Sequence, residues 1–202
     1  MGRARVNPHP GHHYRHPRTE YRGVPVRFGH RGRHGYGHYI TVLPPHYVIR
    51  RYHGIDYYWC DNIWYRYYAG RYWICRPPFG YVFSPISDLA LAACIISYYN
   101  DRQPDVVAEV QKKGSALNLS QNFANSDTEY FYNDGVFYVL TEDGQYAVIV
   151  PPAGAQVESL PDDYEEITID GIMYYKVDDT VYRMIINEEG KACFEVLGQL
   201  RD

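Results

Sequence analysis

The feature that most constrains the fold of this chain is an internal repeat. Residues 43–66 align without a gap to residues 160–183, at a constant offset of 117 positions. A third copy lies between these two, because residues 129–138 (EYFYNDGVFY) match residues 56–65 (DYYWCDNIWY). Self-similarity at a fixed spacing means that one supersecondary unit is used more than once. The sequence therefore predicts an architecture of related units, and it says much less about chemistry.

Each copy is typical of a β-hairpin. Tyrosine, tryptophan, isoleucine and valine fill both arms, and these residues favour strands because they pack well on a pleated surface. Between the arms stands a two-residue turn of types that tolerate left-handed backbone angles. The three turns are Asp61-Asn62, Asp134-Gly135 and Asp178-Asp179.

A two-residue turn also fixes which side chains meet across the hairpin. It predicts three aromatic pairs at equivalent positions, which we take as the core face: Tyr58 with Tyr65, Phe131 with Tyr138, and Tyr175 with Tyr182. The second face changes between copies, so it is the better candidate for a functional surface. It pairs Trp59 with Trp64, Tyr132 with Phe137, and Lys176 with Val181.

Charge divides the chain unevenly. Residues 1–80 contain 13 Lys and Arg against 3 Asp and Glu, whereas residues 81–202 contain 7 against 21. The two parts either attract one another or face different partners. Residues 1–39 are rich in Gly, Pro, Arg and His and have few aliphatic side chains, so we expect a disordered basic arm.

One segment interrupts the hairpins. Pro104 suits a first helical turn and Gly114 a helix end, which predicts a helix over residues 104–113 within an inserted linker of residues 101–126. The apolar run at residues 89–96 fits a helix or a strand, and the echo of the repeat at Tyr98-Tyr99 favours a strand. We predict a mainly β fold in which hairpins form small SH3-like barrels or sheets, with lobes at residues 40–100 and 127–202.

The repeated motif resembles a known family. Leu-Pro-x-x-Tyr, Gly-x-x-Tyr-Tyr and Pro-Pro-x-Gly recur along the chain, as at Leu160-Pro161, Tyr164, Gly171, Tyr174-Tyr175, Tyr182 and Pro151-Pro152-x-Gly154. This pattern is similar to that of bacterial proteins of unknown function, common in Bacteroidetes and Proteobacteria, and the resemblance covers residues 43 to about 200. It implies export to the periplasm or cell envelope, and it implies no activity. The insertion and the tryptophan-rich first copy depart from the family pattern.

A cluster of aromatic residues is the main candidate binding site. Exposed tryptophan and tyrosine faces can stack on sugars, although the same rings can simply fill a core. The candidates lie within the first hairpin and its neighbouring strand: Tyr57, Trp59, Trp64, Tyr72 and Trp73. The partner class that this predicts is a cell-wall glycan, an anionic polymer or an envelope protein, and not nucleic acid. No stretch is long and apolar enough for a transmembrane helix.

Histidines in the arm are the candidate metal ligands. His9, His12, His13 and His16 lie close together, and neutral imidazoles bind Zn, Cu or Ni. The alternative without a metal is a basic, solvated arm. No cofactor is expected elsewhere in the chain.

Catalysis has the weakest sequence support. Cys60 or Cys75 could pair with His46 or His53, but no nucleophile signature surrounds them. The acidic residues at positions 162–166 are expected to form a solvated loop. The sequence therefore predicts a non-enzymatic binding or scaffolding module of the cell envelope, with metal handling or a cysteine-dependent cell-wall enzyme as alternatives.

Overall fold

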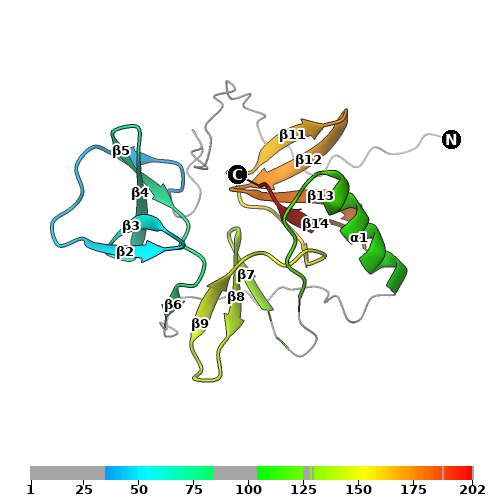
Figure 1. The fold of residues 1–202 in the computed structure, drawn as a ribbon, viewed down its shortest axis with the longest axis horizontal. Coiled ribbons are helices and arrows are strands. Elements are labelled where there is room, and N and C mark those ends of the chain that lie inside the picture. The colour runs from blue at the N-terminus through cyan, green and yellow to red at the C-terminus, as the bar shows by residue number, and fades with distance from the viewer. Residues whose placement is uncertain (1–34, 84–103, 125–127, 129, 188, 202) are drawn as a thin grey trace.

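The described part of the protein forms three antiparallel sheets and one helix, so the predicted mainly β class is confirmed. The computed structural model describes residues 35–83, 104–124, 128, 130–187 and 189–201. Figure 1 places the first sheet at the left, the last sheet at the right, and the middle sheet below and between them. The sheets stay open, so of the two predicted forms the structure has sheets and not closed barrels.

The first and last sheets share one topology, which confirms the repeat. Unit one contains β1 (Tyr39–Ile40), β2 (Val48–Tyr52), β3 (Ile55–Cys60), β4 (Ile63–Tyr68) and β5 (Arg71–Cys75), in the order β1-β5-β4-β3-β2. Unit three contains β10 (Gln156–Val157), β11 (Glu165–Ile169), β12 (Ile172–Val177), β13 (Thr180–Ile186) and β14 (Ala192–Gln199), in the order β10-β14-β13-β12-β11. The strands β1, β2 and β3 lie 117 positions before β10, β11 and β12 and have the same lengths.

Unit two is a shorter version of the same arrangement. It contains β6 (Val82–Phe83), β7 (Tyr130–Asn133), β8 (Val136–Leu140) and β9 (Tyr146–Ile149), in the order β6-β9-β8-β7. Among the described strands, unit two has no equivalent of the edge strands β2 and β11 of the other two units. The inserted segment lies between β6 and β7, so β6 belongs by sequence to the predicted first lobe but pairs with β9 of the second.

The predicted register is confirmed in all three hairpins. Tyr58 lies opposite Tyr65, Phe131 opposite Tyr138, and Tyr175 opposite Tyr182. Two turns adopt the expected left-handed angles at both positions, with φ of 50° and 61° at Asp61 and Asn62 and 48° and 86° at Asp134 and Gly135, whereas in the third turn only Asp178 does, with φ of 51°. Local turn chemistry therefore sets the pairing, as the sequence indicates.

The second hairpin face, expected to be a surface, is largely covered, and it stays partly open only in unit one, where Trp59 is half-buried and Arg50 is exposed. Trp64, Phe137 and Val181 all lie on that face, and all are buried. Their cover comes from distant segments. Phe137 packs with Tyr182 in a core shared by units two and three, and Val181 packs with Val110 and Leu197 beneath the helix.

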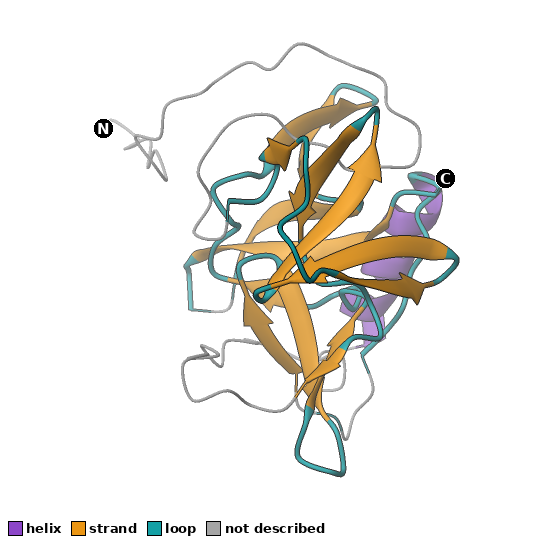
Figure 2. Cartoon of the chain, turned by 90° about the vertical axis from the view of Figure 1, so that its left-hand side faces the viewer, coloured by secondary structure: helices purple, strands orange, loops and turns teal. Residues whose placement is uncertain are grey.

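The helix α1 (Pro104–Ala116) forms where it is predicted and extends three residues further. Figure 2 shows α1, in purple, lying along one side of the strands, where it contacts β14. Arg183 joins the two elements, because its guanidinium bonds Glu195 of β14 at 2.5 Å and Glu109 of α1 at 2.8 Å. Residues 1–34 of the predicted arm (residues 1–39) and the run at residues 89–96 lie outside the described residues, whereas residue 39 of the arm begins β1.

Candidate aromatic pocket between units one and two

The candidate site is an aromatic pocket where unit one meets unit two. It has a volume of about 230 Å³. At ~30 Å³ per water molecule, this is room for roughly eight waters, which suits one sugar ring or one side chain better than a larger ligand. Its aromatic lining comes from four segments of the chain: Trp59 and Trp64 from β3 and β4, Tyr81 and Phe83 around β6, Tyr138 from β8, and Tyr36 from the segment before β1.

Edge-to-face and stacked rings hold these walls in place. Trp64 meets Tyr81 with ring centroids 4.8 Å apart, and Tyr81 stacks on Phe83 at 5.5 Å. Phe83 in turn meets Tyr138 edge-on at 5.7 Å. Each such contact contributes about 0.5–1.5 kcal/mol beyond area burial. The pocket is thus bounded by a continuous series of aromatic contacts from the first sheet to the second.

Trp59 is one of several pocket-lining residues with a polar group, together with Tyr36, Asn62 and Asn133. Its indole Nε1 is buried and has no hydrogen-bond acceptor among the described residues. Leaving a buried donor unpaired costs about 1–3 kcal/mol. The atom is covered in this structure, so a ligand oxygen would reach the N–H and recover that cost only where the indole ring turns toward the pocket.

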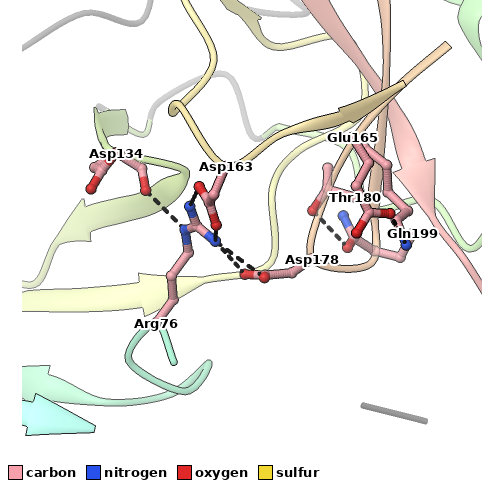
Figure 3. A network of polar contacts seen from close by, with 8 residues as sticks. Arg76, Asp134, Asp163, Glu165, Asp178, Thr180 and Gln199 are labelled. Atoms are coloured by element: carbon pink, nitrogen blue, oxygen red, sulfur yellow. Dashed lines mark hydrogen bonds and ion pairs between the residues drawn. The ribbon is translucent and has the colours of Figure 1, made fainter. Parts of the chain in front are cut away.

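Beneath the pocket, Arg76 connects all three units (Figure 3). Arg76 follows β5 directly, and its guanidinium reaches three turns or connectors of the other units. It bonds both carboxylate oxygens of Asp163 at 2.5 and 3.1 Å, the carboxylate of Asp178 at 3.1 Å, and the main-chain oxygen of Asp134 at 2.9 Å. The Tyr36 ring, which lines the pocket, lies 4.5 Å from the same guanidinium.

The Arg76–Asp163 pair is almost fully buried, whereas Asp178 is one-third exposed. The side chains of Arg76 and Asp163 are 6% and 5% exposed. Burial by itself lowers the pKa of Arg76, but Asp178 and Asp163 more than offset burial, so the pKa rises and the guanidinium stays charged. Burial also raises the pKa of Tyr36, which keeps its hydroxyl neutral against the Arg76 charge. The network therefore fixes unit one against the others and shapes the pocket floor.

The five predicted ligand-binding residues separate into three groups. Trp59 and Trp64 line the pocket. Tyr57 and Trp73 share their face of the sheet, but Trp73 is buried and donates its indole N–H to the oxygen of Tyr68 at 3.2 Å. Tyr72 points to the opposite face, where its ring meets Tyr58 at 5.1 Å.

The structure brings a cysteine and a histidine close together, as the cysteine alternative requires, but the thiol is not activated. Cys60 and His46 border one open hollow on the outer side of Trp59. Burial and the neighbouring Asp61 raise the pKa of the Cys60 thiol, which opposes the thiolate that a nucleophile needs. Burial likewise raises the pKa of Cys75. Cys60, Cys75 and Cys193 are free thiols.

Nothing in the described part of the chain gathers three metal-ligating side chains. The predicted ligands His9, His12, His13 and His16 lie outside the described residues, so metal handling by the arm stays a prediction. None of the described helices is long and apolar enough to cross a membrane.

The sequence analysis did not identify Arg76 as a central residue, and its expectation for Asp163 is wrong. Asp163 was expected in a solvated acidic loop, whereas it is buried against Arg76. The uneven charge along the chain was the available signal, since attraction between a basic first part and an acidic second part was one of the two outcomes that it allowed. It could not select Arg76, because the partners lie 87 and 102 positions away.

The fold and pocket define a β-rich repeat protein with an aromatic pocket between its first two units. A family model described as a family of unknown function, DUF6515, matches residues 97–199, and the chain belongs to this family. The match spans the hairpin of unit two and all of unit three, and it leaves out β1 to β6. Neither a curated protein nor a solved structure matches the chain.

Proposed function

We propose that the chain is a non-enzymatic binding module of the cell envelope that holds a sugar ring of a glycan in its aromatic pocket. The observation that carries this is a pocket walled by aromatic rings, one of which, Trp59, also has a buried and unpartnered indole N–H. Carbohydrate rings offer an apolar face for stacking and hydroxyl oxygens for hydrogen bonds. The envelope location is supported by the resemblance of the tyrosine-rich motif to exported bacterial proteins.

The fixed arrangement of the pocket walls supports the proposal that the pocket binds a ligand. Its two sides come from separate units, and the Arg76 network and the ring contacts hold them together. A frame that is ordered before binding reduces the entropy that the ligand must offset. The raised pKa of the nearby thiols supports binding over cysteine catalysis.

Binding of the full chain to a glycan array and to purified peptidoglycan tests the proposal. Trp59→Ala removes both the stacking ring and the N–H, so we expect affinity to fall roughly tenfold or more. Trp59→Phe keeps a ring and loses only the donor, so we expect a smaller loss, corresponding to about 1 kcal/mol.

Tyr67→Ala is the matched control. Tyr67 is an aromatic residue of the same sheet, 54% exposed, and it lies on the opposite face beside Tyr72. It should leave glycan binding unchanged. Equal losses in Trp59→Ala and Tyr67→Ala, or binding that survives Trp59→Ala intact, would remove the pocket as the binding site.

A further inference from the structure

The side of unit one that faces the pocket carries positive charge. The register places three arginines on this face of the sheet, and each lies over an aromatic ring. The guanidinium carbon lies 5.4 Å from the Trp59 ring centre for Arg50, 5.5 Å from Tyr57 for Arg66, and 4.1 Å from Tyr39 for Arg71. No Asp or Glu occupies a strand position on this face of unit one.

Of these three arginines, Arg50 alone lies over a ring that lines the pocket. Its guanidinium lies over Trp59, and its charge acts on Tyr81, so it stands beside two residues that line the pocket. Arg50 is exposed, and no carboxylate in the described part of the chain pairs with it. Asp61, in the turn after β3, borders the outer hollow and not the pocket.

The neighbouring residue shows the contrast. Arg51 lies on the opposite face of β2, where its Nε bonds the Asp56 carboxylate at 2.7 Å. Two successive arginines of one strand thus differ in setting, since one is ion-paired at the surface and the other is stacked at the pocket. An arginine held on an indole keeps its in-plane N–H groups free to bind an oxyanion.

We infer that the pocket selects an acidic sugar, whose ring stacks in the pocket while its carboxylate meets the Arg50 guanidinium. The inference rests on the proposed function and names the substrate class of that same site. It joins three groups that one acidic sugar satisfies together: the ring walls, the Trp59 N–H and the Arg50 cation. A neutral sugar uses only the first two.

Calorimetric titration of the full chain with a galacturonic acid trisaccharide and with its methyl ester tests the inference. The two probes share the ring and differ in charge. We expect the acid to bind roughly tenfold more tightly than the ester, because a charge-assisted hydrogen bond is lost with the ester. The advantage should shrink as salt is raised, since the contact lies near solvent.

Two variants complete the test. Arg50→Ala should lower affinity for the acid roughly tenfold and leave the ester unchanged, whereas Arg51→Ala, with the same loss of charge one residue away, should change neither. Acid and ester that bind equally well overturn the inference and leave the proposed function standing, because the ring is still bound. Binding of neither probe also overturns the inference, and the glycan array then decides the proposed function by itself. If Arg50→Ala and Arg51→Ala lower affinity for the acid equally, Arg50 acts only through the general charge of the surface, and the inference is overturned.

Discussion

At the scale of the residue, tyrosine serves this chain in two ways. Tyr182 and Tyr65 are buried and fill the cores, whereas Tyr67 and Tyr47 are about half exposed on the outer face of unit one. A phenol can take both roles because its ring is apolar and its hydroxyl is polar. Where the hydroxyl enters the interior, loss of solvation disfavours the phenolate, and Tyr57 is the clearest case on the pocket side of the sheet.

Burial raises the pKa of Tyr57 to about 12, although Arg66 opposes the rise. In the unfolded chain a tyrosine titrates near ~10, so the folded state holds this proton more tightly. The stability contribution is therefore complete below about pH 10 and is lost as pH rises from there through the folded pKa of about 12. Denaturant titrations across this pH range measure how the free energy of unfolding falls as pH rises. For Tyr57→Phe the fall should be less steep than for the natural chain, by up to about 1.4 kcal/mol per pH unit. Identical slopes for Tyr57→Phe and the natural chain would contradict the assignment.

At the scale of the element, the hairpin turn of unit two does more than reverse the chain. Asp134 and Gly135 take left-handed angles, and the Asp134 main-chain oxygen accepts a bond from Arg76. A methyl group on Gly135 would lie 2.6 Å from Arg76 Nε and 2.9 Å from Val177 Cγ1. Arg76 cannot easily move aside, because Asp163 and Asp178 hold its other nitrogens.

Gly135→Ala should therefore destabilise the protein more than an equivalent change elsewhere. Gly171 is the matched control, since it has a φ of 78° in the turn between β11 and β12 and nothing within 4 Å of an added methyl group. Both substitutions incur left-handed strain of about 1–2 kcal/mol. The crowding at Arg76 should add about 1–3 kcal/mol for Gly135→Ala alone, measured as the difference between the two unfolding free energies. Equal losses at both glycines would mean that the turn does not press on Arg76.

The hairpins were predictable because their determinants are local. A two-residue turn and two tyrosine-rich arms suffice to place Tyr58 against Tyr65 and Tyr175 against Tyr182. The fate of the second face was not predictable, since the residues that cover Trp64 and Val181 come from elsewhere in the chain. Trp64 is covered by Tyr81 and Val181 by residues of α1 and β14. The same limit applies to the pocket, of which the sequence identified Trp59 and Trp64 but not the opposing wall.

At the scale of the whole molecule, one ion-pair network links three copies of a unit. Arg76 leaves unit one and meets Asp134 in the turn of unit two and Asp178 in the equivalent turn of unit three. The repeat explains this convergence, because equivalent turns of related sheets are presented to a common centre. The charge contrast along the chain has its structural counterpart here, although most of the acidic residues play no part in it.

Arg76→Met should consequently loosen unit one from the rest. Removing one partner from a buried ion pair leaves uncompensated charge and costs about 3–5 kcal/mol, whereas Arg51→Met, which breaks a solvent-exposed pair, should change the free energy of unfolding far less. The chain provides separate probes for the two parts. All three tryptophans lie in unit one, and α1 packs on unit three.

Tryptophan fluorescence therefore reports unit one, and helical ellipticity reports unit three. In the natural chain we expect both signals to change at one denaturant concentration, because the Arg76 network and the shared rings couple the units. In Arg76→Met the fluorescence transition should move to lower denaturant than the ellipticity transition, while Arg51→Met keeps the two together. If both signals move together in Arg76→Met, the ring contacts of Trp64, Tyr81 and Phe83 couple the units by themselves, and the buried arginine contributes stability without setting how the molecule comes apart.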